Sequence, residues 1–421
     1  MFASSSRLDL SITVGPEKPR HIKTILSGPL PILIDYTRMY GDIAGSALWR
    51  LRAALKHHDR VREIAFEGSR ANFNQILKMT QCAFPVLEGL IICFGDNYYE
   101  PKLPDTFLRG PDLSDLHLRR IALQDVSLAS ISGFLLSATA VTDLYLKIDT
   151  PFGPSPEASL LTCLQGMPCL RRLDLSMSIL SESPLQPPTT PSPKDVVPLS
   201  KLTTLRYGGY GVFLDALAAG LSAPSLRNVS IQFFDHVLPA VTARVHLPRF
   251  ISEIEECYHA VHVNFHDSGF SLSLWTQSEY INHYLPRFKL SRVPGHVPEL
   301  IIRMSGALST RLATVEELRV TFVSTAANVW EDFIPWREFL QHFPRLKAFR
   351  TEGAINCSIA RALLRDHGEP NNDFAFLSAL EELELGKNSS DSPCGPELAA
   401  FEPIVSARQQ AGCPIKVFFS T

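Results

Sequence analysis

Residues 167–175 read Met-Pro-Cys-Leu-Arg-Arg-Leu-Asp-Leu, and the spacing of the leucines in this stretch decides the fold. Leu173 and Leu175 are two positions apart, so in an extended strand they point to one face while Asp174 points to the other. The same L-x-x-L-x-apolar pattern recurs about every 30 residues along the chain. A short strand that returns at this period predicts a stack of repeated strand-and-helix units.

Further copies of the pattern cover most of the chain. They are Val61/Ile64/Phe66, Leu87/Leu90/Ile92, Leu113/Leu116/Leu118, Val141/Leu144/Leu146, Leu202/Leu205/Tyr207, Leu226/Val229/Ile231, Val315/Leu318/Val320 and Leu380/Leu383/Leu385, with Leu346/Phe349 as a weaker member. Between copies the apolar residues take helical spacing, as at Phe73/Ile76/Leu77 and Ile131/Phe134/Leu135. We therefore predict an α/β fold, a leucine-rich-repeat solenoid with degenerate repeats, in which a curved parallel sheet carries helices on its convex side.

The repeat pattern also predicts the domain organisation. Residues 1–60 fit the pattern poorly and are expected to form an atypical N-terminal cap, whereas residues 61–421 are expected to form the solenoid. The stretch 181–200 is rich in Pro, Ser and Thr, which predicts an inserted loop. Ala260 to Phe265 and Phe270 to Leu274 predict two neighbouring strands, as a hairpin or an irregular repeat.

Composition narrows the classes of function. Apolar residues make up 45% of the 421 residues and charged residues 20%, which is typical of a chain that buries a core. The net charge of −3 provides no basic field for a phosphate backbone, so we expect no nucleic-acid binding. The sequence shows neither a signal peptide nor an apolar run of membrane-spanning length. We therefore expect no membrane binding and a cytoplasmic or nuclear location.

Three repeat entries carry a resemblance to a known family: Phe84-Pro85-x-Leu87, Met167-Pro168-x-Leu170 and Phe343-Pro344-x-Leu346. Together with the stretch from Gly28 to Asp35, they resemble the leucine-rich-repeat region of fungal F-box-like proteins. The resemblance implies the substrate-receptor part of a ubiquitin ligase, a role in which an F-box docks on a Skp-type adaptor. We find no F-box in this sequence, so that adaptor is an expected partner only if an F-box exists outside this chain.

The residues between the ladder leucines are the candidates for partner binding, because they point to the opposite face of the strands. This row mixes both signs of charge with Tyr and His, which suits a protein surface better than a polyanion or a membrane. The competing interpretation is that these residues are merely solvated strand positions. The predicted partner-binding residues are Asp115, His117, Asp143, Tyr145, Lys147, Arg172, Asp174, Arg206, Glu317 and Arg319.

Two patterns outline other chemistry only in part. His259, His262 and His266 follow Cys257, but strand alternation separates His259 from the other two, so we predict no metal site. The stretch from Gly208 to Gly211 follows a predicted strand and opens a helix like a dinucleotide-binding turn, yet Leu214 occupies the position of the third glycine. A repeat turn explains these glycines more simply.

No common catalytic motif occurs in the sequence, neither a nucleophile elbow, nor a phosphate-binding loop, nor a zinc-protease motif. We therefore predict a non-catalytic protein-recognition module without a cofactor, whose partner binds the strand face opposite the helices. The alternative prediction is a structural or self-assembling scaffold without a role in ubiquitin ligation.

Overall fold

The fold is known from a computed structural model, in which the chain forms two compact units. Unit 1 comprises residues 1–209 and 216–226, and unit 2 comprises residues 210–215 and 227–421. The structure describes residues 10–13, 30–36, 45–94, 103–104, 106–110, 116–125, 128–148, 156–177, 196–209, 211–233, 258–266, 269–276, 288–292, 302, 305–306, 308–322, 335–352, 359, 363, 377–386, 395–410 and 412–419.

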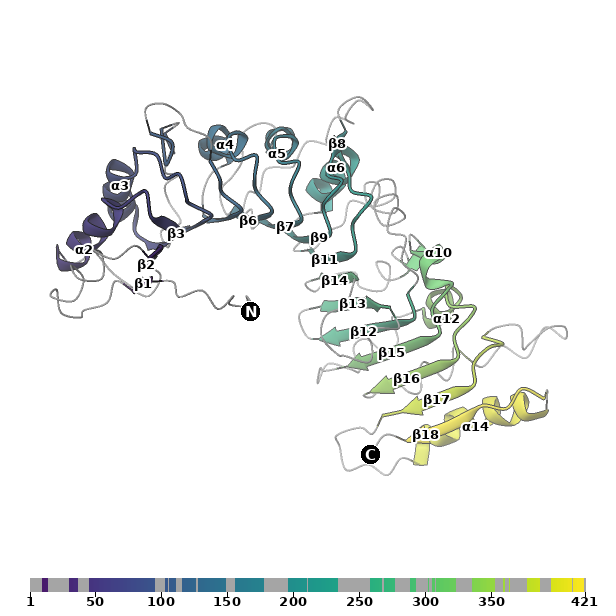
Figure 1. Ribbon diagram of the computed structural model, residues 1–421. Coiled ribbons are helices and arrows are strands. Elements are labelled where there is room, and N and C mark those ends of the chain that lie inside the picture. Colours follow the sequence, from purple (N-terminus) through teal and green to yellow (C-terminus); the bar gives the residue numbers. More distant parts are fainter. Residues whose placement is uncertain are drawn as a thin grey trace. The chain divides into compact units, whose positions relative to one another are not determined.

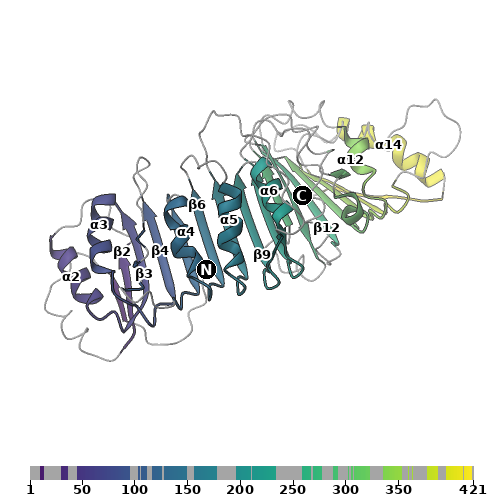
Figure 2. The same ribbon diagram turned by 90° about the horizontal axis from the view of Figure 1, so that it is seen from above.

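Unit 1 alternates strands with helices, and its helices cover one face of a parallel sheet (Figures 1 and 2). Its elements are β1 (Leu10–Thr13), β2 (Ile32–Tyr36), α2 (Gly45–Leu55), β3 (Val61–Gly68), α3 (Arg70–Met79), β4 (Gly89–Phe94), β5 (Arg120–Gln124), α4 (Leu128–Leu136), β6 (Asp143–Ile148), α5 (Pro156–Gln165), β7 (Arg172–Met177), β8 (Val197–Pro198), β9 (Thr204–Gly209) and β10 (Leu221–Ser222). The helix α6 (Gly211–Gly220) contributes residues to both units.

The main sheet of unit 1 runs in the order β1-β2-β3-β4-β5-β6-β7-β9, and every described pair in it is parallel. Successive strands are therefore neighbours, and the described helices between them lie on one face of the sheet. This arrangement confirms the predicted α/β class with a large parallel sheet. A separate parallel pair, β8 with β10, lies outside that sheet.

A tight turn precedes the strands and explains where the prolines occur. The backbone N–H of the first leucine in a copy donates to the carbonyl three residues earlier, as from Leu87 to Phe84 at 3.2 Å and from Leu170 to Met167 at 3.1 Å. Pro85 and Pro168 occupy the second position of these turns, where their fixed φ suits the backbone. The same turn recurs in unit 2, where Leu346 donates to Phe343 at 3.1 Å.

The strand entries follow a second recurring rule, in which one carbonyl accepts two consecutive N–H groups of the next strand. The Thr142 carbonyl accepts from Arg171 at 2.7 Å and from Arg172 at 2.9 Å. In unit 2 the Glu316 carbonyl accepts from Lys347 at 2.8 Å and from Ala348 at 3.0 Å. These contacts set the register, so equivalent residues of successive strands lie side by side.

The register stacks apolar residues into ladders on the helical face. Leu144, Leu173 and Leu205 are paired across β6, β7 and β9, and each is at most 1% exposed. Aromatic rings join this layer to the helices: Phe73 of α3 contacts Phe66 of β3 with ring centroids 5.6 Å apart. The paired leucines make the core of unit 1 continuous from strand to strand. Burial of one such large apolar side chain contributes roughly 1.5–3 kcal/mol to stability.

Unit 2 also combines strands and helices, with α10 and α12 on one side of its strands (Figure 1). Its elements are β11 (Asn228–Phe233), β12 (Ala260–His266), β13 (Gly269–Trp275), β14 (Phe288–Arg292), α10 (Ser309–Leu312), β15 (Glu317–Phe322), α12 (Trp336–Leu340), β16 (Ala348–Glu352), β17 (Glu382–Leu385), α14 (Gly395–Gln410) and β18 (Lys416–Phe419).

The sheet of unit 2 is mixed rather than wholly parallel. β12 and β13 form the antiparallel hairpin that the sequence predicts, and β13 also pairs antiparallel with β14. The strands β12, β15, β16, β17 and β18 then follow in parallel. On the other side of the hairpin β14 pairs in parallel with β11.

One strand lies elsewhere than the sequence predicts. The pattern Leu113/Leu116/Leu118 places a strand there, but β5 begins at Arg120, and Ile121 and Leu123 are its buried residues. Leu118-x-x-Ile121-x-Leu123 fits the same pattern five positions later, and the chain uses this second frame. Leu116 and Leu118 are still buried, at 4% and 0% exposure, as part of the segment that leads into the strand.

The structure describes only part of the predicted N-terminal cap and of the predicted loop. β2 pairs in parallel with β3, so part of the predicted cap of residues 1–60 belongs to the same sheet as the repeats. Of the predicted loop 181–200, residues 181–195 lie outside the described residues, and Val197–Pro198 forms β8.

Candidate functional site

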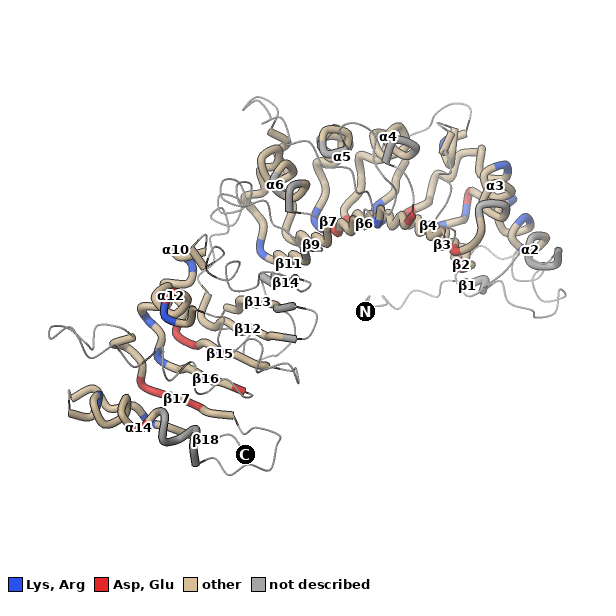
Figure 3. Tube along the Cα trace, turned by 180° about the vertical axis from the view of Figure 1, so that it is seen from behind, with Lys and Arg blue, Asp and Glu red and all other residues tan. Residues whose placement is uncertain are grey.

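The face of unit 1 opposite its helices carries two rows of side chains in register. The first row starts the strands and contains, from β3 to β7, Glu63, Gly89, Arg120, Asp143 and Arg172. The charges along these strands alternate in sign (Figure 3). Since side chains on one sheet face stand about 5 Å apart across neighbouring strands, Arg120, Asp143 and Arg172 face opposite charges, whereas Glu63 faces Gly89.

The second row lies two residues further along each strand. From β4 to β9 it contains Ile91, Ala122, Tyr145, Asp174 and Arg206, again in register. Because Ala122 of this row and Gly89 of the first are small, a groove remains between the larger side chains. The groove has a volume of about 340 Å³ and is lined by residues of β3 to β9, including both charged rows.

Three ion pairs border the groove. Arg120 Nη2 contacts Glu63 Oε2 at 2.7 Å, reaching over the intervening strand β4. Arg172 Nε lies 3.6 Å from Asp143 Oδ1, and Arg206 Nη1 lies 3.8 Å from Asp174 Oδ2. The last two separations exceed hydrogen-bond length, so these pairs are loose.

Gly89 is required by the closest of these pairs. A Cβ at this position would lie 3.1 Å from Glu63 Cγ and 3.2 Å from Glu63 Oε2. The absence of a side chain on β4 therefore lets Glu63 cross towards Arg120. Glycine serves here for close approach and not for an unusual φ.

Burial raises the pKa of two groups in the second row. The pKa of Asp174 is raised mainly by desolvation, against the opposing effect of Arg206 and Arg172. The pKa of Tyr145 is raised by desolvation and then by the charge of Asp174. Tyr145 therefore keeps its O–H at neutral pH and is a hydrogen-bond donor and a flat apolar surface in the middle of the groove.

A third row continues beyond the groove. Lys147 Nζ lies 3.6 Å from Asp125 Oδ1, and Asp125 is itself only 8% exposed. In the same row, burial raises the pKa of Cys93 to about 11, so this thiol stays protonated at neutral pH. Neither feature provides a nucleophile.

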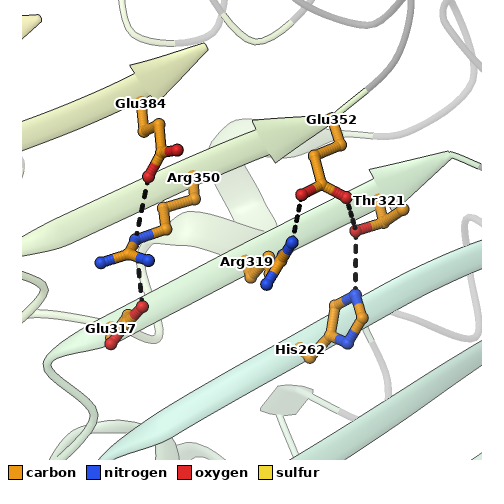
Figure 4. A network of polar contacts seen from close by, with 7 residues as sticks. All are labelled: His262, Glu317, Arg319, Thr321, Arg350, Glu352 and Glu384. Carbon is orange, nitrogen blue, oxygen red and sulfur yellow. Dashed lines mark hydrogen bonds and ion pairs between the residues drawn. The ribbon is translucent and has the colours of Figure 1, made fainter. Parts of the chain in front are cut away.

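Unit 2 carries a denser polar network on the corresponding strands (Figure 4). Arg350 Nε of β16 lies 3.1 Å from Glu317 Oε1 of β15 and 3.3 Å from Glu384 Oε2 of β17. Arg319 forms an ion pair with Glu352. Arg319 and Arg350 are opposite each other in the register of β15 and β16, and each is paired with a glutamate of a neighbouring strand.

A chain of hydrogen bonds extends this network to β12. Thr321 Oγ1 lies 3.2 Å from Glu352 Oε2 and 2.9 Å from His262 Nε2. The His262 ring also stacks on Trp275, with ring centroids 6.0 Å apart. Burial, followed by the charge of Arg319, lowers the pKa of His262 to about 4, so the ring is neutral at physiological pH.

The predicted partner-binding residues fall into four groups. Asp143, Tyr145, Arg172, Asp174 and Arg206 line the groove of unit 1. Lys147 lies in the third row beside that groove, whereas Glu317 and Arg319 belong to the network of unit 2. The remaining two residues are affected by the position of β5.

The prediction for the β5 repeat is corrected by the structure. His117 is exposed but lies before the strand, and Asp115 lies outside the described residues. The outward-facing residues of β5 are instead Arg120 and Ala122. The second reading frame of the leucine pattern would have identified them.

Besides Arg120, four outward-facing lining residues were not selected from the sequence. Glu63 and Ile91 lie on strands that the pattern does predict, but they were not selected. Gly89 and Ala122 contribute by being small, which only the neighbouring side chains make meaningful.

The two other patterns of the sequence have structural explanations. His262 belongs to the network of unit 2, and among the described residues no three His, Cys, Asp or Glu side chains are placed to hold a metal ion. β9 ends at Gly209 and α6 begins at Gly211, as predicted. A Cβ at Gly209 would lie 2.7 Å from the Tyr207 hydroxyl, so packing accounts for this glycine.

Comparisons with known proteins assign no family. No protein-family model matches the sequence, and no curated protein is significantly similar to it. Within the described residues, no helix has both the length and the apolar character needed to cross a membrane.

Proposed function

We propose that this chain is a non-catalytic recognition module of the leucine-rich-repeat solenoid type, similar to the substrate-receptor part of F-box proteins. Its partner is a protein that docks on the helix-free face of unit 1. The observation that carries the proposal is the groove: five outward-facing residues of β6, β7 and β9 line it together. The repeated turns and strand entries support the repeat interpretation.

The chemistry of the groove favours a protein over other ligands. Its rim carries three guanidinium groups and three carboxylates, while its floor carries Ile91, Ala122 and Tyr145. Tyr and Arg are the residue types that contribute most to protein interfaces, because each combines a large contact area with directed hydrogen bonds. The mixed charge provides specificity and not a general attraction for polyanions.

The test is site-specific photo-crosslinking in extract of the native cell. A benzophenone amino acid replaces Tyr145 in the groove, or Trp49, which is 45% exposed on α2, as a matched aromatic control on the helical side. We expect one protein to crosslink through position 145 and not through position 49. Equal patterns at both positions, or none at position 145, would contradict the proposal.

A charge-reversal variant sharpens this test. Arg172→Glu places a negative charge at the groove, and Arg52→Glu places the same charge on the exposed side of α2. We expect the first to weaken the crosslink at position 145 and the second to leave it unchanged. The link to ubiquitin ligation is tested separately, by whether the complete reading frame encodes an F-box that captures a Skp-type adaptor.

Light scattering separates this proposal from the alternative of a self-assembling scaffold. A recognition module keeps its mass when its concentration is raised, whereas a scaffold grows. Growth that Arg172→Glu abolishes would assign the groove to a second copy of this chain.

A further inference from the structure

The arginine is the more exposed member of every ion pair at the groove. The side chain of Arg120 is 44% exposed against 26% for Glu63, Arg172 is 49% exposed against 35% for Asp143, and Arg206 is 51% exposed against 24% for Asp174. A partner that approaches the groove therefore meets guanidinium groups first. The carboxylates lie deeper and balance the charge from below.

Two of these arginines can accept a further carboxylate. The pairs of Arg172 and Arg206 are 3.6 and 3.8 Å long, beyond hydrogen-bond distance. A guanidinium has five N–H donors in a fixed fork, so a carboxylate from outside can bind it without displacing the existing acid. In unit 2, by contrast, Arg350 already lies between two glutamates.

The spacing of the arginines fits an extended chain that crosses the strands. Arg172 and Arg206 lie on the neighbouring strands β7 and β9, two residues apart along the strand direction, so their side chains stand about 7–8 Å apart. An extended chain advances about 3.3 Å per residue, so side chains two positions apart span a similar distance. In the second row, beside Asp174, Tyr145 and Ala122 form a floor that can take one apolar side chain.

We infer that the groove binds an acidic segment of the partner protein, in extended conformation, with two carboxylates about two positions apart and an apolar residue near them. The inference rests on the proposed function and names the chemistry that the same groove recognises. Carboxylates bind Arg172 and Arg206, and the apolar side chain rests on Ala122 beside Tyr145. Association is therefore weakened by salt.

The test is selection of random peptides displayed on phage, with the full-length protein as target. Binders to the Arg172→Glu/Arg206→Glu double variant are removed in each round, so that only peptides that depend on these arginines remain. Circular dichroism confirms that the double variant is folded, and Arg172→Gln/Arg206→Gln replaces it if charge reversal disturbs the fold. Both exchanges are at half-exposed side chains, where such changes are tolerated.

We expect the enriched peptides to share acidic residues around one apolar residue. A labelled synthetic peptide of that sequence should bind in fluorescence anisotropy, lose about tenfold or more in affinity with the double variant, and bind Arg52→Glu as it binds the original protein. Ala122→Trp should also abolish binding, because the indole fills the groove without altering any charge.

Three results would overturn the inference: enriched peptides that are basic or uncharged, an absence of enrichment, or a single-stranded oligonucleotide that binds these arginines more tightly than the peptide. The proposed function fails in a different way. If position 145 crosslinks a protein whose binding Arg172→Glu does not weaken, the recognition function stands and the acidic segment is wrong. If position 145 crosslinks nothing, the function itself is wrong.

Discussion

The helix-free faces of the two units place arginines and carboxylates on equivalent strand positions, but they use them differently. At the groove of unit 1 Arg120 lies 2.7 Å from Glu63, whereas Arg172 and Arg206 lie 3.6 and 3.8 Å from Asp143 and Asp174. In unit 2 Arg350 lies 3.1 and 3.3 Å from two glutamates, and Arg319, Glu352, Thr321 and His262 are linked in a chain.

The difference lies in the residues that separate the charges. Gly89 and Ala122 leave space among the charged groups of unit 1, and the groove results. On β15 and β16 Arg319 stands opposite Arg350, and each arginine reaches diagonally to a glutamate of the other strand. The same strand pattern thus yields a groove in one unit and a connected network of polar side chains in the other.

The largest loss of stability is expected from a change at Arg408, an arginine of unit 2 that makes only internal contacts among those described. This side chain of α14 is 6% exposed and donates to the carbonyls of Leu377, Ser378, Leu380 and Cys413 at 3.0 to 3.2 Å. Leu377 has a φ of 52°, a left-handed conformation that a leucine rarely adopts. Arg408 therefore holds a strained turn ahead of β17.

Arg408→Ala should lower the free energy of unfolding by about 2–4 kcal/mol, because four carbonyls each lose the hydrogen bond that Arg408 donates. Chemical denaturation followed by tryptophan fluorescence measures this, with Arg52→Ala on the surface of α2 as control. Equal midpoints for the two variants would show that the turn does not depend on Arg408.

A pair of glycines offers the next largest contrast. A Cβ at Gly386 in unit 2 would lie 2.6 Å from the Thr351 carbonyl oxygen and 2.7 Å from Glu352 Cα, both backbone atoms within the sheet. At Gly89 in unit 1, the nearest atoms belong to the flexible Glu63 side chain. Gly386→Ala should therefore cost about 1–3 kcal/mol and Gly89→Ala less than about 0.5 kcal/mol.

Thermal midpoints of both glycine variants, measured under the same conditions, check this expectation. A loss at Gly89 as large as that at Gly386 would mean that the groove of unit 1 is as rigid as the network of unit 2.

A third, smaller loss of stability is expected when an arginine of the unit 2 network is removed, compared with an arginine at the groove of unit 1. Arg350→Ala removes the cation between Glu317, whose side chain is 11% exposed, and Glu384. We expect a loss of about 1–2 kcal/mol, since Glu317 is then buried beside a like charge. Arg172→Ala, at a half-exposed pair in unit 1, should change stability by less than about 0.5 kcal/mol.

The Arg350 prediction can be checked by hydrogen exchange of the peptides that contain β15 and β17. Faster exchange there after Arg350→Ala, without change in β6 and β7, is the expected result. If Arg172→Ala destabilises β6 and β7 equally, the ion pairs of unit 1 are structural and the groove is not poised for a partner.

The elements of both units could be predicted from the sequence because burial imposes a period on the residues. Phe73 and Ile76 mark α3, and Leu173 and Leu175 mark β7, since each set must face one core. The hairpin of β12 and β13 was visible for the same reason. Periodicity failed at β5, where the leucines fit two frames and only the pairing of Arg120 with Gly89 and Asp143 selects one.

The groove could be predicted only in part. Its charged residues follow from strand alternation, so Asp143, Arg172 and Asp174 were within reach of the sequence. The space between them depends on Gly89 and Ala122, and a small residue in a strand carries no signal of what its neighbours leave open. The division into two units also lacks a sequence signal, because the leucine pattern continues from Leu202 through Leu226.

The smallest effect at neutral pH, and the one that depends most on conditions, is expected at His262. Its pKa in the folded protein is lowered to about 4, first by burial and then by Arg319, whereas an unfolded chain has a histidine pKa of about 6.5. Above pH 6.5 the ring is neutral in both states and contributes nothing. As the pH falls from about 6.5 towards 4, the unfolded state binds the proton more readily, so the free energy of unfolding decreases.

Replacing His262 with Gln keeps a hydrogen-bonding group near Thr321 and removes the titration. The variant should match the original protein in stability near pH 7.5 and lose less stability between pH 6.5 and 4.5. The unit 1 variant Arg172→Gln serves as control and should follow the original pH profile, because the change removes no histidine. If His262→Gln follows that profile as well, His262 titrates normally, and the closed network of unit 2 is more open to water than its contacts imply.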